Sequence, residues 1–349
     1  MVNLIWIVCS WLFAVVSFFP AIGTTHWVFR LFDFLRIQIT VVLGLLMLAA
    51  PLLFGEFTKL EWGTIAALTI ALVHQLAIIL PYFPLKSKER NPSEDDIVAI
   101  SVNVKQDNQR YDRLIEIVKD IRPHVLLTME TDGAWEKNLA EIEHHYPNVI
   151  RVPMDNRYGM HLYTSMEIKE FDVHYLISGE HPSIEAKLVD TSGNTLVFWG
   201  VHPPPPSPTE KPTSRQKDAE LLKIAKMVRK EKLPVIVAGD FNNATWSRTS
   251  RLFSKISDLT DARKFRGVHS TFPANVKIMR FPIDLLFHSQ AVTVTKIKTL
   301  ESVGSDHLPL LFSFHINERK EEQTRLRKEL QTLAEEKIAE GKIAAKEEN

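Results

Sequence analysis

Three long apolar runs occupy the first part of the chain. They cover about residues 4–19, 37–54 and 65–83, and none of them contains a charged side chain. Each approaches the roughly 20 residues that a helix needs to cross the hydrocarbon core of a bilayer. The first run lacks a basic segment before it and a small-residue cleavage site after it, so we interpret it as a retained helix. Residues 1–85 are therefore predicted to form a membrane anchor with three transmembrane helices.

After a predicted linker over residues 86–94, the pattern changes to short β-branched or alternating runs, which are typical of strands. These runs are 97–104, 125–129, 160–164, 171–176, 184–189, 195–201, 235–238, 283–287, 292–298 and 309–315. Amphipathic spacing predicts helices over 111–121, 135–145 and 215–230. Because strands outnumber helices and several follow one another directly, we expect an α+β domain over residues 95–316, with two packed sheets flanked by helices.

The tail, residues 317–349, is rich in Glu, Lys, Arg, Ala and Gln, and it predicts a charged helix. Leu326, Leu330 and Leu333 form one narrow apolar stripe along this helix. The stripe is shorter than the three to four heptads that identify a coiled coil. The tail is thus expected either to project into solvent or to support self-association of the chain.

Charge is distributed very unevenly along the chain. The totals balance, with 42 Lys plus Arg and 42 Asp plus Glu, but residues 1–85 contain only six charged side chains. These six are Arg30, Asp33, Arg36, Glu56, Lys59 and Glu61. The zero net charge weakens the case for a protein that binds long nucleic acid duplexes. A local basic cluster keeps nucleic acid open as a partner, and its members are Arg248, Arg251, Lys255, Arg263, Lys264 and Arg266.

Basic residues near the apolar runs predict the orientation in the membrane, because Lys and Arg favour the cytoplasmic side. One side would carry Arg30, Arg36, Lys86, Lys88 and Arg90, and the other side carries Lys59 and the N-terminus. We therefore expect a multi-pass protein of an inner or plasma membrane, with the domain on the cytoplasmic side. The single cysteine, Cys9, excludes a disulfide within the chain.

Polar side chains follow directly after several apolar strands of the domain. They are Asn103, Glu130, His202, Asp240 and Asn242, together with Asp284 at a strand start and Asp306 and His307 before another strand. Each alone is explained as a turn or cap residue, but so many at strand ends indicate a site. Asn103, Glu130 and Asp306 offer hard oxygen ligands, which suit Mg²⁺. Zinc is disfavoured, since the sequence contains neither a cysteine ligand set nor an HExxH helix.

The motifs around these residues resemble those of the endonuclease/exonuclease/phosphatase family. The resemblance is carried in order over about residues 95–316 by Ser-Val-Asn103, Met-Glu130, Val-His202, Gly-Asp240-Phe-Asn242, Pro-Ile-Asp284 and Ser-Asp306-His307. It implies a four-layer αββα sandwich and a Mg²⁺-dependent phosphoesterase, in which Mn²⁺ could replace Mg²⁺.

The resemblance also implies a role for each residue. Asn103 and Glu130 would hold the metal, with Asp306 at or near it. Asp240 would orient or deprotonate the attacking water, and Asn242 would help to bind the phosphate. His202 would contact the scissile phosphate, while His307 would pair with Asp284 and stabilise the phosphorane. Asn108 and Arg215 are further candidates for substrate contact.

The substrate stays open at this point, because one fold hosts many activities. A lipid bilayer and a phosphoester, either lipid-derived or nucleic acid, are the expected partners. Three readings remain: a phosphodiesterase or phosphatase, a DNA or RNA nuclease using the same site, and an inactive membrane-anchored binding protein.

Overall fold

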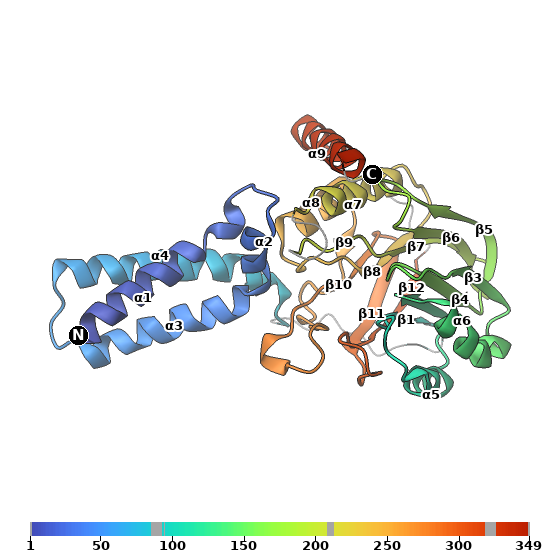
Figure 1. Cartoon of the computed structure of the whole chain (residues 1–349), viewed down its shortest axis with the longest axis horizontal. Coiled ribbons are helices and arrows are strands. Elements are labelled where there is room, and N and C mark those ends of the chain that lie inside the picture. The colour runs from blue at the N-terminus through green and yellow to red at the C-terminus, as the bar shows by residue number, and fades with distance from the viewer. Residues whose placement is uncertain (1, 85–92, 94, 208–212, 318–325, 348–349) are drawn as a thin grey trace.

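The computed structural model describes residues 2–84, 93, 95–207, 213–317 and 326–347. A bundle of apolar helices forms one end of the molecule, and a larger α/β body forms the other (Figure 1). The predicted linker over 86–94 lies outside the described residues except for Ser93.

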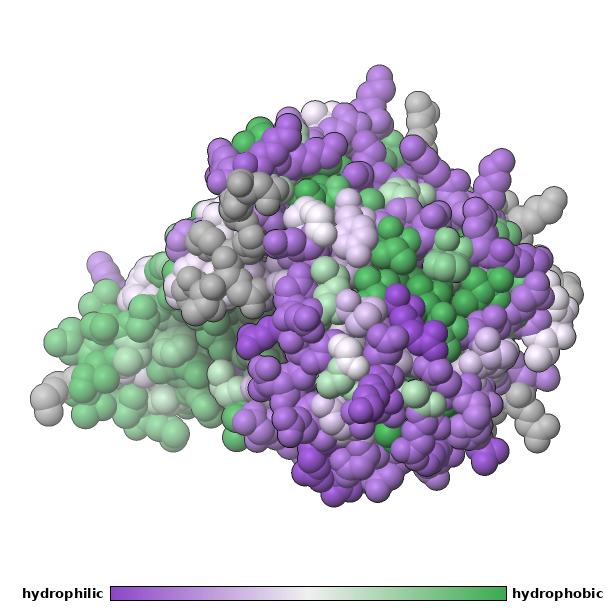
Figure 2. Space-filling view, turned by 45° about the vertical axis from the view of Figure 1, so that its right-hand side comes forward, coloured by the Kyte–Doolittle hydropathy of each residue, from purple (hydrophilic) through white to green (hydrophobic). Residues whose placement is uncertain are grey.

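The N-terminal bundle contains three helices that are long and apolar enough to cross a membrane. The corresponding spans are Val2–Ala21, Arg36–Leu53 and Lys59–Tyr82. They consist of α1 (Val2–Val16) with η1 (Phe19–Ala21), α3 (Arg36–Leu53), and α4 (Lys59–Ile79) with η2 (Leu80–Tyr82). Most of their apolar side chains face outward, and the surface of the bundle is hydrophobic where that of the α/β body is largely hydrophilic (Figure 2). This contrast suggests membrane association.

A short helix that the sequence did not predict joins the bundle to the α/β body. Helix α2 (Trp27–Phe34) lies between the first two spans, and its Arg30 forms a buried ion pair with Asp218, at 3.0 Å. The indole nitrogen of Trp246 donates to the carbonyl oxygen of Asp33 at 2.6 Å. Tyr82 packs against Trp246 in a shared apolar cluster. Helix α2 and the end of the third span are therefore docked on the body.

Two six-stranded sheets form the α/β body. The first has the order β11 (Val292–Thr299), β12 (Leu310–Ile316), β1 (Ile97–Asn103), β2 (Val125–Met129), β4 (Met160–Thr164), β3 (Asn148–Val152). The second has the order β5 (Glu167–His174), β6 (Ser183–Val189), β7 (Thr195–Val201), β8 (Val235–Asp240), β10 (Asp284–His288), β9 (Thr260–Asp261). Within each sheet one central pair is parallel, β1 with β2 and β7 with β8. The carboxyl ends of each parallel pair therefore meet at one edge.

The sheets face each other across a core of interlocking apolar side chains, such as Leu127, Phe198 and Phe312. Helices α5 (Tyr111–Ile121), α6 (Gly133–Leu139) and η3 (Ala140–His145) cover the outer face of the first sheet. Helices α7 (Arg215–Val228) and α8 (Arg248–Ser257) cover the second. The predicted four-layer αββα sandwich is thus confirmed.

The C-terminal helix α9 (Lys328–Glu347) packs along α7 of the same chain. Leu330 and Leu333, from the predicted stripe, are partly buried in the apolar cluster beneath it, so the helix does not project freely into solvent. Self-association through α9 stays a proposal, and it would have to use another face of the helix.

Candidate active site

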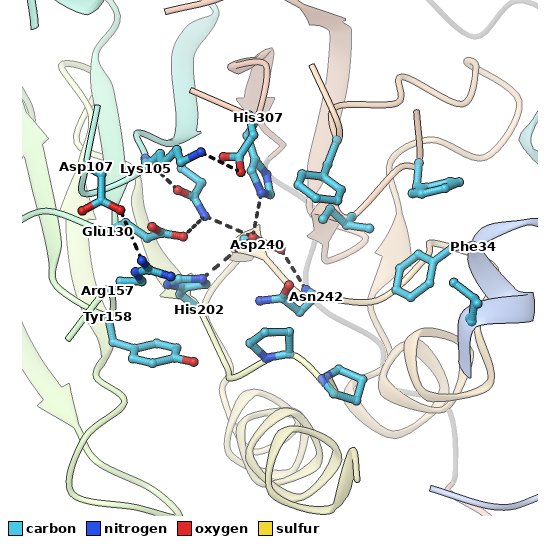
Figure 3. A pocket seen from close by; sticks show the side chains of 18 residues that line it. Phe34, Lys105, Asp107, Glu130, Arg157, Tyr158, His202, Asp240, Asn242 and His307 are labelled. Atoms are coloured by element: carbon cyan, nitrogen blue, oxygen red, sulfur yellow. Dashed lines mark hydrogen bonds and ion pairs between the residues drawn. The ribbon is translucent and has the colours of Figure 1, made fainter. Parts of the chain in front are cut away.

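The polar residues predicted at strand ends come together in one pocket of about 390 Å³ (Figure 3). Asn103 ends β1, Glu130 directly follows β2, His202 directly follows β7, and Asp240 ends β8. Asp284 begins β10 opposite Asp240, because these two strands are antiparallel. The end of the sandwich where both parallel pairs terminate thus gathers carboxylates and imidazoles from distant parts of the chain.

Asp240 lies at the centre of the pocket and is completely buried. Its Oδ2 is 3.6 Å from Nε2 of His307 and 3.8 Å from Nε2 of His202. The amide nitrogen of Asn103 donates to the same oxygen at 3.3 Å. The other oxygen, Oδ1, accepts the backbone N–H of Asn242 at 2.8 Å. Four groups therefore fix the direction of this carboxylate.

His307 and Asp284 form a buried pair behind Asp240. Nδ1 of His307 is 2.9 Å from Oδ2 of Asp284, so Nε2 of the ring faces Asp240. Burial alone would lower the pKa of His307, but the carboxylates of Asp284 and Asp240 raise it to about 10. The ring is therefore a cation at neutral pH, a form that stabilises negative charge in front of it.

Burial also shifts the pKa values of Asp240 and His202. Burial raises the pKa of Asp240, while the neighbouring His307 draws it down. Burial lowers the pKa of His202, and Asp240 acts in the opposite direction. His202 thus favours the neutral ring, in contrast to His307, although both rings face the same carboxylate.

Glu130 and Asn103 form a hydrogen-bonded pair beside Asp240 in the pocket. The amide nitrogen of Asn103 donates to Oε1 of Glu130 at 2.8 Å. Glu130 has a φ of 61°, which is unusual for a non-glycine residue and costs about 1–3 kcal/mol. Burial raises the pKa of Glu130, although the hydrogen bond from Asn103 acts against this. Glu130 forms no ion pair with any described residue, so a cation would stabilise it.

The structure also brings Asn242 and Asp306 to the pocket, but not two other predicted residues. Asn108 donates its amide hydrogens to the carbonyl oxygens of Val104 and Val303, and so ties two loops together. Arg215 is exposed at the start of α7 and lines a different hollow, next to Gly23 and Lys337. Neither side chain lines the pocket.

The pocket contains residues that the sequence did not indicate. Its polar side includes Lys105, Asp107, Arg157 and Tyr158, and its apolar side includes Leu31, Phe34, Pro205, Pro206, Phe272, Phe281 and Ile283. Lys105 stands two positions after Asn103, a proximity that could have identified it. Leu31 and Phe34 belong to α2, and no local signal connects them to the site because their position depends on how α2 docks.

Lys217 lies outside the pocket and holds the loop that follows Asp240. Its buried ammonium group donates to the carbonyl oxygen of Asn242 at 2.8 Å and to Oδ1 of Asn243 at 2.6 Å. Burial lowers the pKa of Lys217 to about 7. The side chain thereby holds the loop that follows Asp240, although it lies on a helix predicted only as amphipathic.

Sequence comparison agrees with this geometry. The pattern that defines the endonuclease/exonuclease/phosphatase family matches residues 100–307, which is more than half of the chain. The chain therefore belongs to this family, whose members hydrolyse phosphoester bonds with the help of divalent metal ions. The expectation of an inactive binding protein is thereby set aside.

One curated relative is a UPF0294 protein of Vibrio campbellii, which is 32% identical over 101 residues. The match covers 29% of this chain and 34% of that protein, so it spans only about a third of the relative's length.

Solved structures share the fold at low sequence identity. A humanized D. rerio TDP2 has a TM-score of 0.52 at 17% identity, covering 64% of this chain and 100% of that one. The catalytic domain of human Nocturnin has a TM-score of 0.52 at 16% identity, with 64% and 96% covered. A mannosyl-6-phosphatase of Bacteroides thetaiotaomicron has a TM-score of 0.50 at 19% identity, with 63% and 100% covered. These likenesses extend to the fold alone.

Proposed function

We propose that the chain is a membrane-anchored, divalent-metal-dependent phosphoesterase whose attacking water is activated by Asp240. The observation that carries this proposal is the convergence on Asp240 of two imidazoles, from His202 and His307, beside a pair of hard oxygen donors. General-base catalysis, charge stabilisation and metal binding are the three requirements of phosphoester hydrolysis, and one pocket provides side chains for each.

Glu130 would hold the metal ion, with Asn103 and Asp306 beside it. The donor set fits Mg²⁺, which binds through one or two carboxylates and keeps several waters, and Mn²⁺ would fit the same oxygens. When bound, the ion would neutralise charge on the phosphoryl oxygens. Asp240, Asp284 and His307 also place potential ligand atoms within 4.8 Å of one another. His307 and Asp284 are already joined to each other by a hydrogen bond, so we assign the ion to Glu130 instead.

Each remaining side chain would act at a defined atom. Oδ2 of Asp240 would take a proton from water as the water oxygen bonds to phosphorus and the ester P–O bond breaks. The alkoxide leaving group would take a proton from solvent water, and the proton on Asp240 would return to solvent. The imidazolium of His307 would stabilise the charge of the phosphorane, with Asp284 holding its ring. His202 and the amide of Asn242 would contact the non-bridging phosphate oxygens.

We further propose that the three apolar spans cross an inner or plasma membrane and that the catalytic domain lies on the cytoplasmic side. The anchor is expected to contact the lipid bilayer on all its outward faces. The basic residues on the domain side of the spans support this orientation, although Arg30 and Arg36 also form buried ion pairs with Asp218 and Asp33.

A nuclease would use the same site, but the surroundings offer little support for it. Arg263 of the basic cluster is fully buried, and Arg266 donates to the carbonyl oxygens of Ala262 and Val294. Arg251, Lys255 and Lys264 line a separate hollow at the end of α4. The cluster therefore does not form a basic track that leads to the pocket.

The test is hydrolysis of a chromogenic phosphodiester by the full chain in detergent. Asp240→Asn and His307→Ala should each lower kcat at least about 100-fold, because general acid–base groups contribute on this order. Excess EDTA should abolish turnover and added Mg²⁺ should restore it. Asp172→Asn, an exposed carboxylate on β5, is the matched control and should keep full activity. Turnover that persists unchanged in both variants, or in chelator, would contradict the proposal.

A further inference from the structure

The pocket has two faces of opposite character. Glu130, Asp240 and His307 lie on one side, and the ring of Phe34 points into the opposite side from α2 (Figure 3). Leu31, one turn earlier on α2, lines the same apolar side and is 41% exposed. The membrane anchor therefore contributes part of the wall of the catalytic pocket. Such a pocket is suited to a ligand that combines a phosphoryl group with an apolar portion.

A hairpin over residues 272–281 extends the apolar side from the catalytic centre to the anchor. Its base is closed by a backbone bridge between Phe272 and Phe281. The ring of Phe272 lies 4.8 Å from the ring of His307, and that of Phe281 lies 5.5 Å from that of Phe34, measured between centroids. Two aromatic contacts, joined through the backbone bridge between Phe272 and Phe281, thus lead from the imidazole of His307 to α2.

The tip of this hairpin lies at the level where the second span begins. The side-chain nitrogen of Gln38 donates to the carbonyl oxygen of Ile278 at 2.9 Å, and Gln38 is the third residue of the span Arg36–Leu53. Ile278 is 83% exposed, and Val276 and Met279 beside it are 45% and 37% exposed. Apolar side chains so exposed beside a transmembrane span are stabilised by insertion into the interface of the bilayer.

The cations in the pocket are already paired. Nζ of Lys105 is 3.5 Å from Asp306, and the guanidinium of Arg157 is 3.2 Å from Asp107. They are the only Lys or Arg residues among the described residues that line the pocket. A nucleic acid strand needs a row of basic groups along its backbone, whereas a single phosphoester with an apolar chain does not.

We propose that the substrate is a membrane lipid that carries a phosphoester. Its phosphoryl group would bind beside Glu130, Asp240 and His307, and its apolar chain would lie along Leu31, Phe34 and Phe281 toward the bilayer. The hairpin tip would hold the pocket open to the lipid surface. This inference rests on the proposed phosphoesterase activity and names the class of substrate for that site.

The first experiment measures how activity depends on chain length. The full chain in detergent hydrolyses p-nitrophenyl alkyl phosphodiesters with ethyl, butyl and octyl chains. Each fully buried methylene contributes about fourfold in binding. Burial of only two or three of the methylenes that octyl adds to ethyl should therefore raise kcat/KM at least about 30-fold. Leu31→Ser should flatten this rise at least about fivefold. Partition into detergent affects both enzymes alike, so the ratio between them reports on the pocket.

The second experiment tests the bilayer. In nanodiscs, Ile278→Ser should slow hydrolysis of a long-chain lipid phosphodiester at least about threefold, because the tip loses its apolar contact with the membrane. Phe171→Ser is the matched control for both experiments, since Phe171 is 52% exposed on β5, at the end of the body remote from the anchor (Figure 1). This variant should behave as the wild type.

The outcomes separate the substrate class from the chemistry. Equal kcat/KM for all chain lengths, or a preference for a single-stranded oligonucleotide over the octyl diester, would overturn the lipid substrate while leaving the phosphoesterase in place. A free apolar phosphoester, rather than a membrane lipid, is indicated if Leu31→Ser matters and the nanodisc lipid is not cleaved. If Asp240→Asn matches the wild type on every substrate, the phosphoesterase and the lipid substrate both fail.

Discussion

Helix α7 buries three neighbouring ionisable side chains outside the pocket, and each of them has a partner. Lys217 donates to the loop after Asp240, Asp218 pairs with Arg30, and Glu220 accepts a hydrogen bond from Ser183 at 3.1 Å. The pKa values of Asp218 and Glu220 shift in opposite directions. Burial would raise the pKa of Asp218, but Arg30 and Lys217 hold it below its usual value. No cation among the described residues pairs with Glu220, and burial raises its pKa to about 8.

Glu220 should therefore make stability depend on pH. Its ordinary pKa is 4.5, so between about pH 4.5 and 8 the unfolded chain releases the proton that the folded chain keeps. The unfolded state then binds fewer protons, and the free energy of unfolding falls as pH rises, by at most roughly 1.4 kcal/mol per pH unit. Glu220→Gln cannot ionise and should remove this part of the fall.

The measurement is the thermal unfolding midpoint of the full chain at pH 5 and pH 8. The midpoint of Glu220→Gln should fall less than that of the wild type between the two values. Glu116→Gln, whose side chain is 67% exposed on α5, should keep the pH dependence of the wild type. An identical fall in all three proteins would contradict a protonated Glu220.

Residues at strand ends could be predicted from the sequence because strand pattern and side-chain chemistry are both local. Asn103 and Asp240 end apolar strands of the two facing sheets, and these strands place both residues at the same end of the sandwich. Leu31, Phe34 and Lys217 could not be predicted in the same way. Their contribution to the pocket depends on the docking of helices that carry no chemical motif of their own.

At the scale of elements, α2 is the part that couples the anchor to the enzyme. Arg30 is nearly buried in its ion pair with Asp218, which also accepts hydrogen bonds from Ser214 and Thr249. A buried carboxylate that loses its cationic partner is destabilising, whatever the pair contributes in total. The docking of α2 should thus be sensitive to this one contact.

Arg30→Ala should lower the stability of the protein by about 3 kcal/mol, the cost typical of removing one partner of a buried pair. Thermal unfolding of the full chain in detergent measures this as a clear drop in midpoint. Arg113→Ala removes an exposed pair with Glu116 on α5 and should change stability by less than about 1 kcal/mol. Equal midpoints for Arg30→Ala and Arg113→Ala would mean that the pair does not fasten α2.

Elements missed in the sequence share one property, which is that their apolar positions are few or mixed with charge. Strand β3 has five residues at a sheet edge, and only Ile150 is fully buried. Helix α8 buries Leu252, Phe253 and Ile256 in the outer core, but polar and basic residues such as Arg251 and Lys255 interrupt this short apolar pattern. The longer strands and helices were predicted because their apolar patterns repeat over more residues.

At the scale of the whole molecule, the proposed insertion of the three spans would determine where the pocket stands relative to a membrane. The three spans pack side by side, and the N-terminus and the loop between α3 and α4 lie at the end of the bundle away from the α/β body (Figure 1). With the spans across a bilayer, the N-terminus and that loop face one side and the body faces the other. The pocket then opens close to the membrane surface, since α2 forms part of its wall.

Cysteine labelling tests which side the body occupies. Cys9 is the only cysteine, so a Cys9→Ala background allows single cysteines to be introduced at exposed positions. Glu56→Cys lies in the loop between α3 and α4, and Glu336→Cys lies on α9 beside the body. Because basic residues favour the cytoplasm, an impermeant maleimide on intact cells should label the cysteine at 56 and spare the one at 336. Both should react after the cells are lysed, which controls for accessibility of the thiol. Labelling of 336 but not 56 would reverse the orientation, and would place the lipid substrate in the opposite leaflet while leaving the pocket and its two faces unchanged.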